Sequence, residues 1–330
     1  MKDKRRKEFF SESKCLRACD YLYSNLIVCS DCTIHSASIM MSDQNIFQLN
    51  PQPTESYISL QRVEGDEWSF EFTRIGENEF QTLGDITEAY KLGIVDDALQ
   101  AAQALVETYP EFLDARYVLL NLLLNKEEHE RAFEFLLESM SLAMQCIPPE
   151  FQFNVDTIPY YYEDNQAFLM MQAHCGGLMV EAGMIEEAIE FLKMHLSINP
   201  DDDLGTRTTL LNAYFLKGAP EKILELAGDF PDEDLWAMLY GVSLAQFQLG
   251  KKEAAEKNFR RAVKMFPLAA AELIKRGHPE TIIPVDILNE PSDADLALDY
   301  WYQFGTFWES TPGAIAWVQQ MLGKQKLRLK

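Results

Sequence analysis

The sequence predicts an all-α protein, an α-α superhelical solenoid of about five helix pairs with a short N-terminal β-hairpin and a C-terminal helical cap. Three observations carry this prediction. Apolar residues recur at helical spacing from about residue 79 to 277. A block with Gly, Ala and Pro at fixed spacing occurs three times in that stretch. Proline-broken, aromatic-rich helical segments follow it.

Composition excludes several classes of function. The chain has 330 residues with 29 basic and 52 acidic side chains, so its formal net charge is −23. This deficit of positive charge argues against nucleic acid or an anionic membrane as the main partner. There is no run of eighteen apolar residues, so we expect no membrane-spanning helix. We expect a cytoplasmic protein, in which Cys146 and Cys175 are isolated buried thiols.

Residues 1–41 differ in composition from the rest of the chain. They carry seven basic and five acidic residues, a net of +2, whereas the remainder carries −25. We interpret them as a loose extension or a misassigned start. Four cysteines at zinc-like spacing leave a metal site open as an alternative, but the loop between the pairs is short for zinc modules. We expect no metal and no cofactor; the cysteines are Cys15, Cys19, Cys29 and Cys32.

Residues 42–78 read as a polar loop followed by a β-hairpin. Ile58 and Leu60 precede the turn 64–67, and Trp68, Phe70 and Phe72 alternate with polar residues after it. A single hairpin is marginally stable by itself, so this one must pack on another element. We expect that element to be the first helix downstream.

Residues 79–277 contain the repeats. In each of three blocks a Gly precedes an Ala by five residues, and a Pro follows that Ala by twelve. Gly is suited to ending the first helix in the left-handed conformation, Ala allows the second helix to approach closely, and Pro ends the second helix. The blocks are Gly93–Ala98–Pro110, Gly183–Ala188–Pro200 and Gly250–Ala255–Pro267.

This frame resembles the tetratricopeptide repeat, whose unit is a helix pair of about 34 residues with small residues at the crossing. Two further units are degenerate: one has Glu127 where Gly is expected, and the other has Ile223 in place of Ala. Units then start near residues 79, 113, 169, 204 and 236. The long step after 113 places an insertion near 145–166. The resemblance implies the fold and leaves the partner open.

Residues 278–330 form the predicted cap and a basic tail. The order of Pro267, Tyr300, Trp308, 311–314 and Trp317 resembles the C-terminal region of the suppressor-of-tumorigenicity family and related bacterial repeat proteins. The end of a repeat array exposes an apolar face unless a cap covers it. The tail 324–330 is a basic strip on an acidic protein.

Arg207 is a candidate because it is a rare cation in an acidic region and could hold an acidic group. The other candidate binding residues lie on what we call the inner stripe. These are the second, fifth, ninth and twelfth residues of each unit, on the helix face that lines the concave groove in this repeat class. Tyr and Asn there combine contact area with directional hydrogen bonds. Packing against the cap or a neighbouring helix is the alternative, and for Arg207 the alternative is an ion pair with Asp201–Asp203. The candidates are Tyr90, Tyr117, Asn121, Arg207, Asn212, Phe215, Tyr240 and Phe247.

The sequence therefore predicts a non-catalytic protein–protein interaction module that holds a peptide or helix in its groove. Its acidity predicts a basic or neutral protein partner. One alternative is an enzyme whose site lies between the 145–166 insertion and the cap, built from 160–163 and His174. Another is a scaffold that self-assembles through its basic tail. The sequence leaves the oligomeric state open.

Overall fold

The computed structural model describes residues 57–230, 235–279 and 292–328, with side chains as far as residue 323. The predictions for residues 1–41 and their four cysteines lie outside these residues. The chain divides into two compact units. The N-terminal unit is Met1–Cys175 with Ser197–Pro200, and the C-terminal unit is Gly176–Leu196 with Asp201–Lys330.

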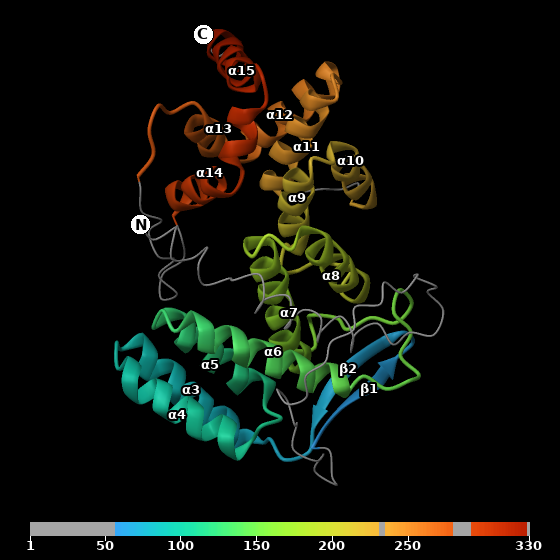
Figure 1. The fold of residues 1–330 in the computed structure, drawn as a ribbon, viewed down its shortest axis with the longest axis vertical. Helices are drawn as coiled ribbons and strands as arrows, with labels where there is room; N and C mark the ends of the chain where they lie inside the picture. The colour runs from blue at the N-terminus through green and yellow to red at the C-terminus, as the bar shows by residue number, and fades with distance from the viewer. Residues whose placement is uncertain (1–56, 231–234, 280–291, 329–330) are drawn as a thin grey trace, which may run out of the picture. The chain divides into compact units, whose positions relative to one another are not determined.

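The N-terminal unit holds the hairpin and the first two helix pairs (Figure 1). α4 packs on α3 and on α5, and α5 packs on α6. A loop then leads to α7, whose first part belongs to this unit. The elements are β1 (Ile58–Glu64), β2 (Glu67–Phe72), α3 (Glu77–Lys91), α4 (Val95–Thr108), α5 (Leu113–Asn125), α6 (His129–Gln145) and α7 (Glu163–Glu181).

The C-terminal unit holds most of α8, two further helix pairs and three more helices. α11 packs on both α10 and α12, and α14 contacts α9, α11 and α13. The elements are α8 (Ile185–Ile198), α9 (Thr206–Lys217), α10 (Pro220–Asp229), α11 (Trp236–Gln248), α12 (Lys252–Met265), α13 (Pro267–Leu273), α14 (Asp293–Ser310) and α15 (Ala314–Arg328).

The predicted fold class is confirmed: the described chain is helical, with one antiparallel two-stranded hairpin before the helix pairs and further helices after them. The turns inside the pairs follow the predicted rule. Gly93, Gly183 and Gly250 have φ of 80°, 80° and 71°, and Gly218 has 69°. Glu127 occupies the same turn position with φ 58°, a conformation in which a Cβ is unfavourable.

Small residues lie where helices cross. Ala98, Ala188 and Ala255 have at most 1% of their surface exposed. Ser243 Oγ of α11 donates to the carbonyl of Ala255 at 2.9 Å, which requires the two helix backbones to approach closely. A Cβ on Gly241 of α11 would overlap a methyl carbon of Leu211 in α9. These positions fix the spacing between neighbouring helices.

The hairpin does not rest mainly on the first helix downstream, contrary to our expectation. Phe70 makes an edge contact with Phe168 of α7 at 5.0 Å, and Trp68 contacts Phe151 of the preceding loop at 5.6 Å. Asn165 of α7 accepts from the Phe70 amide at 3.0 Å and donates to the Trp68 carbonyl at 3.0 Å. The reason is that the loop after α6 pairs with the hairpin edge and brings α7 onto its apolar face.

That loop, residues 146–162, lies within the range 145–166 predicted for the insertion. The Trp68 amide donates to the Thr157 carbonyl at 2.9 Å, and the Thr157 amide donates to the Asp66 carbonyl at 2.7 Å. The Ile158 amide donates to the Ile198 carbonyl at 2.6 Å. The insertion therefore connects the hairpin, through its backbone, to the end of α8.

The left-handed Glu127 gives a first testable prediction. Replacing Glu127 with Gly should stabilise the protein by about 0.5–1 kcal/mol, because the loss of Cβ strain outweighs the greater freedom of Gly in the unfolded chain. Glu134→Gly, at an exposed position inside α6, should destabilise it by about 1 kcal/mol. Urea denaturation followed by circular dichroism measures the free energy of unfolding of both variants. Equal effects of the two variants would contradict the conclusion that the Cβ of Glu127 is strained.

Gly241 gives a second testable prediction. Gly241→Ala should destabilise the C-terminal unit by about 1–3 kcal/mol, because its methyl would collide with the fully buried side chain of Leu211. Gly84→Ala is the matched control: it is also helical, but nothing lies within 4 Å of the added Cβ. The control should stabilise by about 0.5–1 kcal/mol. Thermal unfolding of the two variants would show opposite shifts in Tm.

Candidate functional site

The predicted binding residues fall into two groups with different surroundings. Tyr90, Tyr117 and Asn121 belong to the N-terminal unit, and the other five belong to the C-terminal unit. In the N-terminal unit the inner stripe is partly accessible. Phe80, at its first position, is 45% exposed, and Tyr90, Tyr117 and Asn121 are half-buried.

Tyr117 lies at the centre of a polar and aromatic group on this stripe. Its ring lies 5.8 Å from the ring of His174 in α7, with an angle of 39° between the planes. Asn121 Nδ2 donates to the Tyr117 carbonyl one turn back at 2.9 Å. Burial raises the pKa of the Tyr117 hydroxyl, and Tyr160 raises it further. Burial also lowers the pKa of His174, so its imidazole is neutral near pH 7.

Sequence reasoning overlooked Asp114, although it is the second residue of its unit and so belongs to the inner stripe. Burial raises the pKa of this carboxyl to about 6, and the negative charges of Asp164 and Glu163 at the start of α7 contribute to the same rise. Its Oδ2 has no hydrogen-bond partner among the described residues. The pKa of Asp164 is raised as well, first by burial and then by Glu163. A cation placed beside Asp114, at this end of the inner stripe, would therefore be stabilised by the nearby carboxylates.

Two predicted residues of the C-terminal unit are buried and do not line a surface. Tyr240 is fully buried, and its hydroxyl donates to the Phe266 carbonyl at 2.9 Å. Arg207 is 7% exposed, and its Nη1 lies 3.0 Å from Asp202 Oδ2. Its guanidinium also lies 4.7 Å from the ring centre of Phe230. For Arg207 the structural ion pair considered as the alternative is what forms.

Asn212 and Phe215 of α9 are covered by α14. Asn212 Nδ2 donates to the Gln303 carbonyl at 3.1 Å. Phe215 stacks on Phe307 with ring centres 5.0 Å apart and an angle of 20°. The chain itself thus occupies the inner stripe of this helix, because α14 must bury its aromatic residues somewhere and α9 offers an apolar face.

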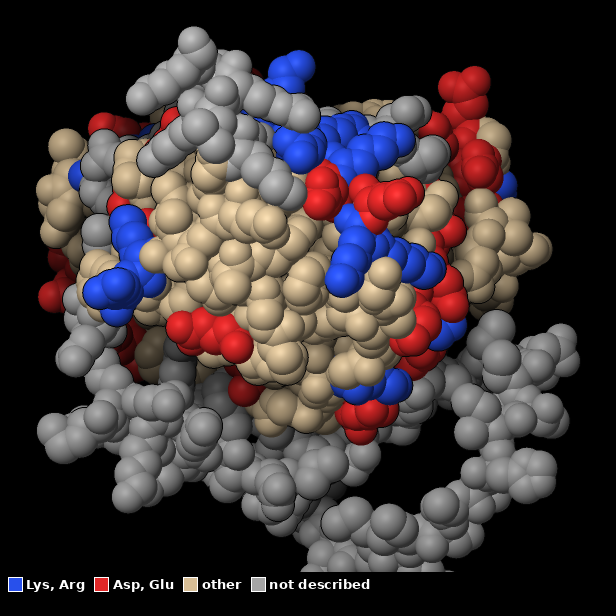
Figure 2. Space-filling view, turned by 90° about the horizontal axis from the view of Figure 1, so that it is seen from above, with Lys and Arg blue, Asp and Glu red and all other residues tan. Residues whose placement is uncertain are grey.

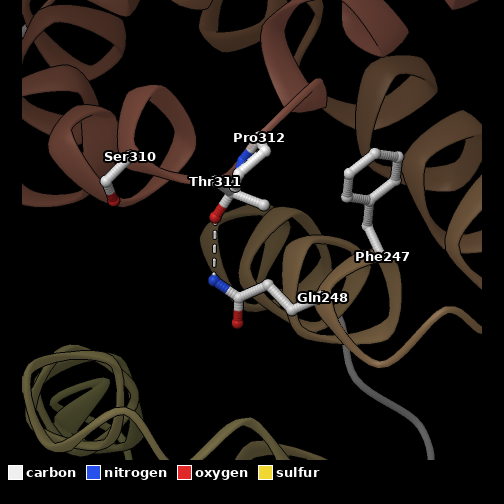
Figure 3. Close-up of a pocket in the computed structure, with 5 residues that line it drawn as sticks. All are labelled: Phe247, Gln248, Ser310, Thr311 and Pro312. Atoms are coloured by element: carbon white, nitrogen blue, oxygen red, sulfur yellow. Dashed lines mark hydrogen bonds between the residues drawn. The ribbon is translucent and has the colours of Figure 1, made fainter.

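Phe247 remains partly accessible at the end of α11. Its ring lies 5.1 Å from Trp317 of α15 and forms one wall of a small open pocket of about 350 Å³. Figure 3 shows how Gln248 reaches Thr311 across this pocket, where Gln248 Nε2 donates to Thr311 Oγ1 at 2.9 Å. The lining residues are Phe247, Gln248, Ser310, Thr311 and Pro312.

The groups considered for an enzyme lie in two places, with Tyr161 and Tyr162 beside Glu67 of the hairpin and with Tyr160 and His174 near Tyr117. Tyr162 donates to Glu67 Oε2 at 2.9 Å, and Tyr161 packs on the ring of Tyr162 at 4.7 Å. His174 instead faces Tyr117. Hydrogen bonding to Glu67 raises the pKa of Tyr161 and Tyr162, which opposes their use as bases or nucleophiles.

The described part of the chain offers neither a metal centre nor a membrane-spanning helix. Within residues 57–230, 235–279 and 292–328, His, Cys, Asp and Glu side chains nowhere gather in threes as a metal ion would need. The helices described there are too short or too polar to cross a membrane. Burial lowers the pKa of His195 to about 4, as for a packed core residue.

Comparison with known proteins gives one family and a set of distant structural likenesses. The profile of the Tcf25 family, described as transcriptional repressor TCF25, matches residues 85–324 of the 330. This match extends over the C-terminal region that resembles the suppressor-of-tumorigenicity family. A search of curated proteins returned no match.

The structural likenesses are to tetratricopeptide-type repeats. YrrB, titled a TPR protein with an unusual peptide-binding site, is 14% identical and has a TM-score of 0.40, covering 58% of this chain and 89% of its own. The nearly identical TPR-like repeats assigned to a Podosopora anserina kinesin light chain are 14% identical with a TM-score of 0.42, covering 57% and 94%. A variant of those repeats is 13% identical with a TM-score of 0.41, covering 58% and 97%.

The half-buried Asp114 predicts a pH-dependent stability. The pKa of this carboxyl is about 6 in the folded protein against an ordinary value of 3.8, so the folded state holds the proton more tightly between these pH values. Stability therefore falls as pH rises from about 4 to 6, and the full penalty applies above pH 6. Asp114→Asn should stabilise the protein at pH 7.5 by about 1–3 kcal/mol, and the gain should vanish near pH 4.

Asp97→Asn is the matched control, since Asp97 is an exposed carboxylate in the first turn of α4. It should give no gain at either pH, because the exposed charge favours the helix N-terminus. Denaturation curves at both pH values measure the effect. A pH-independent gain for Asp114→Asn would show that burial does not perturb its ionisation.

Proposed function

The chain belongs to the Tcf25 family, and we propose that it is a non-catalytic protein–protein interaction module that binds a peptide or a helix. The observation that carries this proposal is the accessible inner stripe of the N-terminal unit. There Tyr90, Tyr117 and Asn121 lie half-buried on α3 and α5, and Tyr117 also packs beside His174 of α7.

The composition of this stripe suits a protein ligand. Aromatic rings supply contact area, and the amide of Asn121 supplies directional hydrogen bonds, as in the cores of protein interfaces. The exposed ring of Phe80 extends the same stripe along α3. Tyr117 and His174 offer shape and hydrogen bonding to a partner, because both side chains are neutral near pH 7.

The charge of the stripe's surroundings favours a basic or neutral partner. Residues 77–145, from α3 to α6, hold 4 basic and 14 acidic side chains, so 4 − 14 gives a net charge of −10. A Lys or Arg of the partner placed beside Asp114 would relieve the repulsion between Asp114 and the carboxylates of α7. We propose that such a cation is one determinant of recognition.

The family description, transcriptional repressor, is compatible with a role exerted through protein contacts. The net charge of −23 disfavours direct binding of the nucleic-acid backbone by the chain as a whole. The free thiols Cys146 and Cys175 support a reducing compartment, and we keep the cytoplasm as the proposed location. The self-assembling alternative rests on the side chains of the tail 324–330, outside the described residues.

Peptide display tests the proposal. Peptides selected from a random library on the wild-type chain should lose at least about tenfold in affinity for the double variant Tyr117→Ala, Asn121→Ala, because a central aromatic contact and its polar neighbour are removed. Selected peptides should be enriched in Lys or Arg. Fluorescence anisotropy measures the affinities, and circular dichroism checks that helix content is unchanged.

The matched control removes the same residue types from other positions. Tyr161→Ala, Asn125→Ala takes away an exposed Tyr and an exposed Asn that do not belong to the inner stripe. It should leave the affinities within about twofold. Selected peptides that bind both double variants as tightly as wild type would rule out the inner stripe as the binding surface.

A further inference from the structure

The charge of the chain is unevenly distributed, and one segment within the helix array is strongly basic. Residues 251–276, which include α12 and α13, hold 8 basic and 3 acidic side chains, a net of 8 − 3 = +5. The rest of the chain then carries −23 − 5 = −28. Sequence reasoning noted the basic tail and the positive net charge of residues 1–41 but missed this segment, because its lysines and arginines are interrupted by apolar core positions.

The basic residues lie together because the helix sorts them. In α12 the buried positions are Ala255, Phe259, Ala262 and Val263, so the opposite face is left for charged side chains. Lys257, Arg261 and Lys264 follow at spacings of four and three residues and are exposed. Figure 2 looks onto the part of the C-terminal unit where α12, α13 and α15 lie in Figure 1, and shows groups of Lys and Arg with acidic side chains between them.

Internal ion pairs neutralise only part of this surface. Arg260 lies 3.4 Å from Glu256, and Lys275 pairs with the buried carboxylate of Glu272. Among the described residues, Lys257 and Lys264 form no ion pair. Like charges that are only partly neutralised raise the free energy of the unbound protein and attract anions.

Apolar side chains continue the basic face at its C-terminal end. Met265 is 43% exposed and Leu268 is 41% exposed, and they flank the turn between α12 and α13 directly after Lys264. A partner that uses both features must combine negative charge with apolar side chains. An acidic amphipathic peptide does so, whereas a nucleic-acid strand would find cations but, in this segment, only buried aromatic rings to stack on.

We propose that the solvent face of α12, together with Met265 and Leu268, is a second docking surface that binds an acidic, amphipathic segment of a partner protein. Its residues belong to a different unit from those of the proposed inner-stripe surface, which favours a partner of the opposite charge. The chain would then hold two protein ligands of opposite charge.

Anisotropy titration of the full-length chain tests this surface with a labelled helical peptide rich in Glu and Leu. Lys257→Glu, Lys264→Glu should weaken its binding by at least about tenfold and reduce the dependence of affinity on salt. Met265→Ser, Leu268→Ser should weaken it about three- to tenfold while leaving the salt dependence unchanged. Helix content measured by circular dichroism should match the wild type in both variants.

The control Lys91→Glu, Lys193→Glu changes the net charge by the same amount at exposed positions of α3 and α8. Its affinity for the peptide should stay within about twofold of wild type. Equal losses for the two lysine pairs would show a general charge effect and overturn the proposal. So would failure of the wild type to bind the peptide, or tighter binding of single-stranded RNA in competition with it.

Discussion

A helix pair cannot bury both of its apolar faces alone, and this constraint underlies the whole structure. Each pair must therefore find a neighbour along the array and a covering for whatever apolar surface remains. In the N-terminal unit the remaining apolar surface is covered by the hairpin, whose Phe70 packs on Phe168 of α7. In the C-terminal unit α14 supplies the covering, with Tyr300, Phe304 and Trp308 almost completely buried.

This difference in covering decides how much of the inner stripe is accessible in each unit. Where a hairpin packs on α7, the inner stripe of α3 and α5 stays partly accessible. Where α14 packs on α9 and α11, the same stripe becomes an internal interface, so its aromatic residues contribute to stability. The partly accessible exception, Phe247, lies where α14 ends and the chain turns at Thr311 into α15.

Electrostatics follow the same division. The segment from α3 to α6 is strongly acidic, and its half-buried Asp114 has a pKa of about 6 because burial and nearby carboxylates disfavour its charge. The segment 251–276 carries a net charge of +5 within a chain of net charge −23. The net charge of the whole chain therefore describes neither segment, because a partner senses mainly the charges within a Debye length of about 8–10 Å.

Local chemistry in the sequence determined the repeat frame. Gly93, Gly183 and Gly250 had to be left-handed, Ala98, Ala188 and Ala255 had to be small, and apolar periodicity placed the helices. The sequence also indicated the unusual turn at Glu127. Only the tertiary structure decided which stripe residues remain accessible, because that depends on which distant element packs over each helix face. Tyr240 and Tyr117 both hold inner-stripe positions, yet Tyr240 is fully buried and Tyr117 is half-buried. The physical reason is that the elements packed over each helix come from segments far away along the chain.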